Sequence, residues 1–242
     1  MKLILLFLLI FNPLYAAQTT LYLGTSHHSP ITSSNQDGVI DLILQELAQR
    51  LEIEIIIDPV GSGERVLLNA NNGVIDGDVG RVLGLERLYP NLISIPIPIY
   101  HYEMVVFSKN ITFKVTGKES IMPYNIGVLR GWKILETIST GAAAVTNLEN
   151  AEQMFNMLDK NRIDIAPFEK NEGLVLLKKM GLKDIKALQP SLLEGDFHLY
   201  LHKKHKNLIP EITEEFSKMQ HDGTIEYINK TVLKKHLNYE GY

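Results

Sequence analysis

Hydrophobic residues along the chain repeat with two periods, one typical of strands and one typical of helices. Residues 20–25, TLYLGT, form a short apolar run that predicts a strand. In residues 39–51 the apolar side chains recur every three or four positions, so one helical face is expected to be buried. Residues 54–58, EIIID, are again apolar and β-branched. This strand–helix–strand order predicts a parallel sheet, because parallel strands need a crossover connection.

The next part of the chain continues this unit and then changes character. A short helix is expected at residues 64–71, and residues 74–80 return toward the sheet. Three prolines interrupt residues 90–98, which predicts an extended segment crossing to another part of the molecule. A strand at residues 103–108 follows this crossing.

A second α/β series fills the middle of the chain. The expected elements are a strand at residues 125–129, a helix at 133–140, a strand at 142–145, a helix at 150–159, a strand at 163–168 and a helix at 170–180. Residues 197–202 then alternate like a strand, and residues 208–235 form a helical tail broken at Asp222-Gly223. Two α/β series with a late return segment predict two lobes joined by two crossings. A ligand cleft is expected between them, near the loops that leave the carboxyl ends of the strands.

The first 17 residues, MKLILLFLLIFNPLYAA, have the order of a secretory signal. Lys2 precedes an unbroken apolar run that is too short to span a bilayer as a helix, and two alanines follow. Leu14 or Tyr15 stands where a small residue is preferred for cleavage, so an uncleaved anchor is the alternative. We expect residues 1–17 to be a signal peptide and the mature chain to be periplasmic.

The charge balance and the absence of cysteine narrow the class of protein. Without Lys2, 23 basic residues remain against 28 acidic residues, so the mature chain carries a charge near −5 with histidine neutral. Such a chain has no electrostatic basis for binding nucleic acid or an anionic membrane surface. With no cysteine, it has no disulfide, no thiol chemistry and no lipid-modified cysteine. We therefore expect a free, monomeric periplasmic protein.

Several segments, in their order and spacing, resemble one known family. They are LYLGTSHHSPI followed by DGVIDLILQELAQRL; NGVIDGDVG leading into LERLYPNL; NIGVLRGWKILE; ENAEQMFNMLDKNRIDIAPFE; and KNLIPEITEEFSKMQHDGTIEYI. Together they resemble the extracellular solute-binding proteins of family 3, the amino-acid-type periplasmic binding proteins, over nearly all of the mature chain. The resemblance implies a type II periplasmic-binding-protein-like α/β fold whose two lobes close like a hinge. It places lobe 1 at residues 18–108 and 197–242, and lobe 2 at residues 109–196.

The resemblance also implies where a ligand carboxylate binds. In the family an arginine a few residues beyond an aspartate-initiated strand holds that group. Arg87 occupies the matching place, and Arg81 is the competing candidate. A guanidinium group can donate two parallel hydrogen bonds to one carboxylate while staying charged. Where many family members have Thr or Ser between these positions, this chain has VLG. The departure argues against an ordinary α-amino acid and allows a ligand with more than one anionic group.

On the second lobe, the family places an acidic residue after a strand to bind the ligand ammonium, and Glu169 matches it. The alternative is that Glu169 begins the helix at residues 170–180 and stabilises its dipole. Trp132 and Lys133 lie in the turn after residues 125–129, at the start of a helix whose free N–H groups could bind an anion. Trp132 is expected either to cover the ligand or to pack between the lobes.

Ser26 and His28 follow the first strand, where the family offers polar and aromatic side chains to the ligand. The neighbours His27 and His28 would point to opposite sides of an extended chain. His198 and His202 have helical spacing but fall in a predicted strand. We therefore expect no metal ion and no other cofactor.

The resemblance implies capture of a small anionic or zwitterionic, amino-acid-like solute by hinge closure, for ABC-type uptake. The expected partners are that small carboxylate and a membrane transporter or receptor, and not nucleic acid. Gly61-Ser62-Gly63 lacks the G-x-S-x-G spacing and no phosphate loop is present, so we do not expect an enzyme. Two alternatives stay open. One is a sensory or regulatory ligand-binding protein, and the other is a periplasmic dehydratase-like enzyme that uses Glu169 as general acid.

Overall fold

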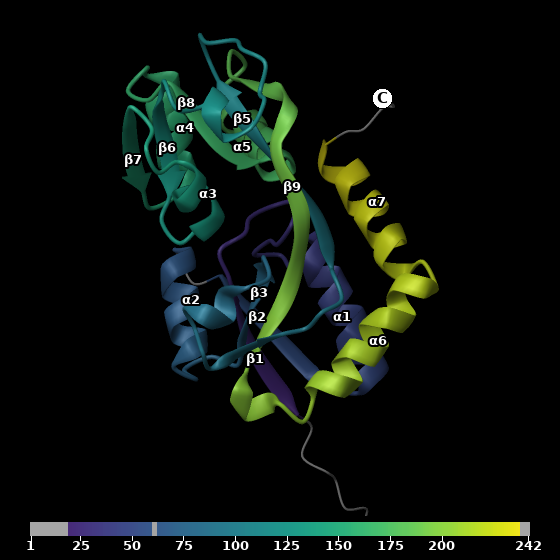
Figure 1. Cartoon of the computed structure of the whole chain (residues 1–242). Coiled ribbons are helices and arrows are strands. Elements are labelled where there is room, and N and C mark those ends of the chain that lie inside the picture. The colour runs from purple at the N-terminus through teal and green to yellow at the C-terminus, as the bar shows by residue number, and fades with distance from the viewer. Residues whose placement is uncertain (1–18, 60–61, 238–242) are drawn as a thin grey trace, which may run out of the picture.

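The computed structural model describes residues 19–59 and 62–237 of the 242-residue chain. The signal peptide predicted at residues 1–17 lies outside the described residues. Figure 1 shows two α/β lobes, one above the other, with strand β9 (Lys186–His202) running through both. The architecture is a pair of α/β units joined by extended chain.

The lower lobe of Figure 1 is built on the strand–helix–strand unit that the sequence predicts. Strands β1 (Thr20–Thr25) and β2 (Glu54–Pro59) pair in parallel and are connected by helix α1 (Val39–Leu51). Strand β3 (Gly77–Arg81) pairs in parallel with β1 and antiparallel with β9. The other elements of this lobe are α2 (Gly63–Asn71), η1 (Leu85–Arg87), β4 (Leu92–Ser94), η3 (Lys203–His205), α6 (Ile209–His221) and α7 (Thr224–Leu237).

The periodicity of α1 determines how it packs on this sheet. Its apolar side chains at Ile40, Ile43 and Leu44 are fully buried, as are Leu21 and Leu23 of β1. One face of α1 therefore covers the sheet, which confirms the face predicted from the sequence.

The upper lobe contains the second α/β series. Its elements are β5 (Tyr100–Ser108), η2 (Lys118–Ser120), β6 (Asn125–Leu129), α3 (Lys133–Ile138), β7 (Ala144–Leu148), α4 (Ala151–Asp159), β8 (Ile165–Glu169) and α5 (Lys170–Met180). The strand order across both lobes is β2-β1-β3-β9-β5-β8-β6-β7, with β4 also paired to β9. Helix α3 ends two residues earlier than predicted, and β7 lies slightly later than predicted.

The start of β9 differs from the sequence prediction. The strand begins at Lys186 rather than at residue 197. Its first part pairs antiparallel with β5, and the register shifts between Met104 and Val106 of β5. Pro190 falls in the part of β9 opposite this shift, where the ladder needs no N–H donor. The pairing is tertiary, so the local sequence pattern, which contains a proline and no alternation, does not reveal it.

The C-terminal helices bind the two lobes along one side. Helix α7 packs against α1 of the lower lobe and α5 of the upper lobe, and Figure 1 shows α6 and α7 running up this side of the molecule. Lys235 of α7 forms an ion pair with Asp37 at 2.7 Å, and Ser29 contacts the ring of His236 at 3.1 Å. These contacts hold the loop that follows β1.

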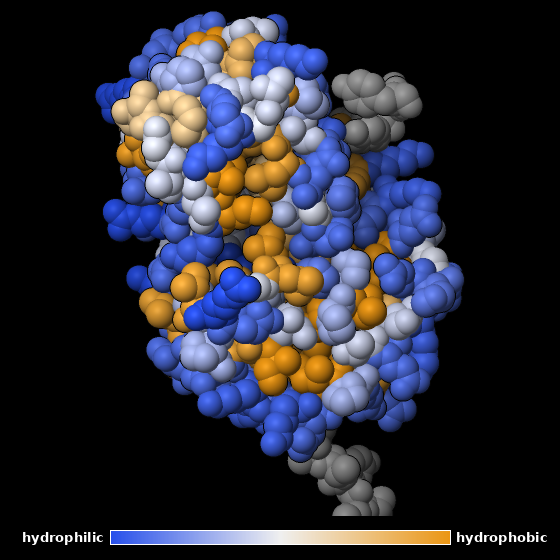
Figure 2. All heavy atoms as spheres, in the orientation of Figure 1, coloured by the Kyte–Doolittle hydropathy of each residue, from blue (hydrophilic) through white to orange (hydrophobic). Residues whose placement is uncertain are grey.

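Figure 2 shows how hydrophobic and hydrophilic residues are distributed over the two lobes and their junction. Hydrophobic side chains gather where the lobes meet and in a second group on the lower lobe, and hydrophilic residues cover much of the rest of this face. Within residues 19–59 and 62–237, no helix has the length and apolar character that crossing a membrane requires.

The core of the upper lobe contains a group of aromatic rings. Phe155 meets Phe107 and Phe168 edge to face, with ring centroids 5.2 and 5.8 Å apart. Gly173 of α5 lies directly over Phe107, since a Cβ placed on it would lie 2.3 Å from the Phe107 ring. A glycine is therefore required inside this helix by close packing rather than by backbone conformation.

Replacing Gly173 with alanine is expected to destabilise the protein by about 1–3 kcal/mol, because overpacking outweighs the gain of up to about 1 kcal/mol in helix propensity. Urea denaturation measures this change in the free energy of unfolding. Lys178→Ala on the exposed face of the same helix is the control and should change stability by less than about 0.5 kcal/mol. An increase in stability for Gly173→Ala would contradict the packing described.

Candidate functional site

A cleft separates the two lobes at the ends of their strands. Its central part, which we call the central cleft, has a volume of about 270 Å³. Its walls are Ser26, His28, Ser62, Gly63 and Arg65 of the lower lobe and Leu129, Arg130, Trp132, Glu149 and Asn150 of the upper lobe. The position of the cleft agrees with the rule that ligands bind beyond the carboxyl ends of strands in α/β sheets.

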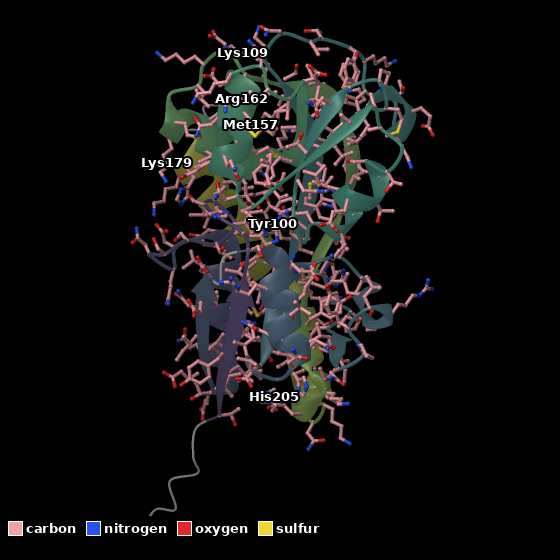
Figure 3. All side chains as sticks on the ribbon, turned by 90° about the vertical axis from the view of Figure 1, so that its left-hand side faces the viewer. Tyr100, Lys109, Met157, Arg162, Lys179 and His205 are labelled. Atoms are coloured by element: carbon pink, nitrogen blue, oxygen red, sulfur yellow. The ribbon has the colours of Figure 1, made fainter. Side chains whose placement is uncertain are left out.

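A larger groove continues from the central cleft along one side of the junction. This side groove has a volume of about 500 Å³ and shares His28 and Asn150 with the central cleft. Its walls are the loop of residues 25–34 together with the start of α4 and the face of α5 that carries Lys179. Figure 3 places Lys179 at the edge of the upper lobe and Tyr100 near the centre of the molecule, where the lobes meet.

Arg81 is buried at the end of β3 and is held by two contacts. Its Nε donates a hydrogen bond to Asp78 Oδ2 at 2.8 Å, and its Nη2 donates to the carbonyl oxygen of Gly63 at 3.2 Å. Burial raises the pKa of Asp78 to about 6, and the adjacent Arg81 opposes this rise. The pair fixes the direction of the guanidinium group.

Gly63 packs closely against Arg81 and Ser26 at the wall of the central cleft. A Cβ on Gly63 would lie 3.1 Å from Arg81 Nη1 and 3.2 Å from Ser26 Oγ. Ser26 Oγ is buried and has no hydrogen-bond partner among the described residues. Because a buried hydroxyl normally has a partner, this atom is available to a ligand.

His27 and Glu172 connect the two lobes at the inner end of the cleft. Glu172 Oε1 of α5 contacts His27 Nδ1 at 2.7 Å, and Glu172 Oε2 accepts a hydrogen bond from the backbone N–H of His28 at 3.0 Å. The other ring nitrogen of His27 lies 2.7 Å from the carbonyl oxygen of Gly80. Both ring nitrogens of His27 therefore lie within hydrogen-bond distance of oxygen atoms, one from each lobe.

The electrostatics of Glu172 follow from this arrangement. Burial opposes ionisation of its carboxyl group, but the contacts with His27 and His28 hold its pKa below the ordinary value. The hydrogen bond to Glu172 correspondingly raises the pKa of His28. A charged contact with this geometry is stronger than a neutral hydrogen bond.

Glu169 caps helix α5 and does not line the central cleft or the side groove. Its Oε2 accepts a hydrogen bond from the N–H of Glu172 at 2.7 Å, and its Oε1 accepts one from the Tyr100 hydroxyl at 3.3 Å. Burial, and next the charge of Glu172, raise the pKa of Glu169 to about 8. This geometry agrees with the second of the two roles considered for Glu169 from the sequence, that of a carboxyl group at the start of the helix.

Trp132 packs between the lobes and forms part of the cleft wall. Its ring stacks on Phe168 of the upper lobe at 4.8 Å and meets His27 of the lower lobe at 5.5 Å. It also lines a hole of only about 30 Å³ beside Arg81 and Lys133. A hole of this size accommodates one or two water molecules, since one water needs about 10–15 Å³ of such volume.

Lys133 forms ion pairs with Glu64 of the lower lobe and with Glu136, the latter at 3.2 Å. The N–H of Gly131 donates a hydrogen bond to the Glu136 side chain at 2.8 Å. The anion site that the sequence suggests at the start of this helix is therefore occupied in part by a carboxylate of the protein itself.

Arg87 lies apart from the other residues that the sequence singles out. It belongs to η1, is exposed, and lines neither the central cleft nor the side groove. The structure thus brings Ser26, His28 and Trp132 together at the cleft, with Arg81 behind Gly63.

Arg65 and Glu172 are important residues that the sequence does not single out. Arg65 lies in the first turn of α2 and is exposed at the wall of the central cleft. Glu172 lies in the first turn of α5, where an acidic residue is ordinary. Their significance depends on contacts across the cleft, which no local pattern records.

The backbone of Gly131 touches the opposite lobe. Its φ is +84°, and a Cβ on it would lie 2.1 Å from the backbone nitrogen of Glu64. Gly131→Ala is therefore expected to hold the lobes apart, which small-angle X-ray scattering should detect as a larger radius of gyration. Gly141→Ala is the matched control, because Gly141 has a φ of +93° and nothing within 4 Å of its Cβ position. Equal radii for the two variants would show that the contact does not limit closure.

The raised pKa of Glu169 makes stability depend on pH. The folded state keeps this proton up to about pH 8, whereas the unfolded chain loses it near the ordinary value of 4.5. The stabilisation is thus fully present below pH 4.5 and is lost as the pH rises to 8, with a slope of at most about 1.4 kcal/mol per pH unit. Urea denaturation between pH 5 and 8 should give a flatter profile for Glu169→Gln. Parallel profiles would refute the assignment.

Comparison with known proteins supports the fold. No protein-family model matches the chain. An uncharacterized protein of Shewanella oneidensis is 24% identical over 201 residues, which cover 76% of this chain and 70% of that protein. At this identity the relative does not establish the function of the present chain, which is therefore argued from the residues of its own site.

Solved structures match over most of the chain. An ancestral arginine-binding protein bound to glutamine gives a TM-score of 0.75 at 17% identity and covers 89% of this chain and 98% of its own. An arginine 3rd transport system periplasmic binding protein from Legionella pneumophila gives 0.71 at 18% identity, covering 89% and 100%. A histidine kinase sensor domain with similarity to periplasmic binding proteins gives 0.77 at 13% identity, covering 89% and 96%.

These likenesses confirm the fold class predicted from the sequence. The structural neighbours include substrate-binding proteins of amino-acid ABC transporters that cover about 90% of this chain. The chain therefore has the mixed α/β type II periplasmic-binding-protein fold, with its candidate site in the cleft between the two lobes.

Proposed function

We propose that this chain is a periplasmic solute-binding protein that captures a small anionic or zwitterionic, amino-acid-like solute in the central cleft. The observation that carries the proposal is the cleft itself, whose walls come from both lobes and include Arg65 and Ser26. Arg65 has no ion-pair partner among residues 19–59 and 62–237, and Ser26 Oγ is buried without a partner. A cation and a donor without partners favour an anionic ligand group.

Binding is proposed to favour closure of the lobes. Arg65 and Ser26 Oγ would hold the anionic group from the lower lobe, and Trp132 would cover it from the upper lobe. Closure is favoured only to the extent that the solute binds the closed form more tightly than the open form. The closed form would then be recognised by an ABC-type transporter.

The sequence predicts lobes of residues 18–108 with 197–242, and residues 109–196; we propose that the first boundary lies instead at the start of β5, because β5 pairs with elements of the upper lobe. Strand β5 pairs with β8 of the upper lobe from Met104 to Ser108. Tyr100, at the start of β5, pairs with Phe197 of β9, from which β9 continues into the lower lobe. Hinge bending is therefore expected near the Tyr100–Phe197 pair.

A sensory role is the second candidate, because one structural neighbour is a histidine kinase sensor domain. Both roles use the same cleft and differ in the partner of the closed form. A neighbouring gene for a membrane permease would favour transport, and one for a signalling protein would favour sensing.

A thermal-shift screen of the mature chain against amino acids, dicarboxylates and aromatic acids tests the proposal. A bound solute should raise the melting temperature, since a ligand that binds only the folded state stabilises it. Arg65→Ala should weaken binding by about 10- to 100-fold, the effect of losing one charged hydrogen bond. Titration calorimetry measures this change.

Arg87→Ala is the matched control, because Arg87 is also an exposed arginine of the lower lobe but does not line the cleft. Its affinity for the same solute should equal that of the wild type. If Arg87→Ala weakened binding and Arg65→Ala did not, the carboxylate would bind at η1, as the family resemblance implies. If no solute stabilised the wild type, the proposal would be wrong.

A further inference from the structure

We infer that the solute is an organic acid without a free ammonium group, and that it carries an apolar extension that lies in the side groove. An N-acylated amino acid has this chemistry. The inference rests on the proposed function and names the class of ligand. It follows from the charges along the cleft, the space available at each point, and the hydrogen-bonding groups between the two spaces.

The carboxylates at the cleft already have cationic partners. Glu149 pairs with Arg130 at 3.2 Å, and Glu152 pairs with Lys179 at 3.2 Å. Glu64, beside the central cleft, pairs with Lys133. Among the described residues that line the central cleft and the side groove, no carboxylate is left to receive an ammonium group. An ammonium group enclosed there would be left without a counter-charge, which is unfavourable.

The two carboxyl groups nearest the inner end of the cleft are also fully engaged. Glu169 and Glu172 are each less than 2% exposed. Both oxygens of Glu172 contact the loop of His27 and His28, and both oxygens of Glu169 accept hydrogen bonds from within the upper lobe. Neither group lines the central cleft or the side groove.

One cationic side chain at the cleft, that of Arg65, has no carboxylate partner. Arg65 lines the central cleft and has no ion-pair partner in the part of the chain that the structure describes. Ser26, in the same wall, is 93% buried, and its Oγ has no hydrogen-bond partner among the described residues. The groups of the central cleft that are still free to bind a ligand, Arg65 and Ser26 Oγ, therefore favour an anion.

The space beside Arg81 and Trp132 is too small for a whole amino acid. His27 lines it together with Phe197, and about 30 Å³ remains. Space for more than a carboxylate lies outward, in the central cleft of about 270 Å³, in the side groove of about 500 Å³ and in a polar space of about 360 Å³ beside Arg65 and Arg130. Ligand sites of small molecules commonly have volumes of about 300–1,000 Å³.

The side groove has an apolar face. Ile57 of the lower lobe and Val175 and Leu176 of the upper lobe line it and are only partly buried. A solute that covers these side chains gains about 25 cal/mol for each Å² of apolar surface removed from water. An alkyl or aryl group is therefore the part of the ligand that fits this groove.

Asn150 and His28 lie where the two spaces meet. Asn150 Oδ1 caps helix α4 by accepting a hydrogen bond from the N–H of Gln153 at 2.8 Å. Asn150 lines both spaces, and its amide nitrogen remains as a hydrogen-bond donor. A carbonyl group between the acid and the apolar extension, as in an N-acyl linkage, matches this donor.

Titration calorimetry of the mature chain with glycine, N-acetylglycine and N-hexanoylglycine tests the inference. N-acetylglycine should bind at least ten-fold more tightly than glycine, because acylation removes the ammonium charge. N-hexanoylglycine should bind at least ten-fold more tightly again, because its longer chain covers the apolar face of the side groove.

Two variants locate these effects. Leu176→Asn should reduce the affinity ratio of N-hexanoylglycine to N-acetylglycine from at least ten to below three. Arg65→Ala should weaken both acylated ligands by at least ten-fold, and Arg87→Ala serves as the folded control.

The outcomes separate the inference from the proposed function. If glycine or another free amino acid binds more tightly than its acylated form, the inference is overturned and the solute-binding function stands. If acyl length has no effect on affinity, the apolar extension is overturned. If neither amino acids nor acylated acids bind, both proposals fail together.

Discussion

The arrangement of the two lobes depends on one buried carboxylate. Glu172 of α5 is 1% exposed and receives His27 through one oxygen and the backbone N–H of His28 through the other. A carboxylate removed from water is costly unless it is paired and hydrogen-bonded, so the upper lobe can bury Glu172 only while the loop after β1 stays against it. The lower lobe presents this loop because β1, α1 and α7 hold both of its ends.

The cleft follows from that contact. With His27 placed against Glu172, Gly80 and Trp132, the space beside Arg81 shrinks to a hole of about 30 Å³. The spaces large enough for a solute therefore lie farther out, at the surfaces that carry Arg65, Asn150 and His28. The same interaction that closes the inner end of the junction therefore decides which charges and which apolar surface a solute meets.

Much of the fold follows from local sequence patterns, and less of the site does. The periodicity of residues 39–51 and 170–180 predicts α1 and α5 with their observed ends, because one face of each helix is buried against a sheet. The first part of β9 could not be predicted, since it is a strand only through pairing with β5. Ser26 and His28 were singled out through the family resemblance, and Trp132 through its place at the start of a helix; all three line the central cleft. Arg65 and Glu172 were not, because each resembles an ordinary charged residue in a first helical turn until the opposite lobe is in place.

The most direct test of this account is a double-mutant cycle between His27 and Glu172, measured as free energies of unfolding for His27→Gln, Glu172→Gln and the double variant. A charged, buried hydrogen bond between the lobes predicts a coupling energy of about 1.5–3 kcal/mol. A coupling within about 0.5 kcal/mol of zero would mean that the two residues act independently, and that something other than this carboxylate holds the lobes together.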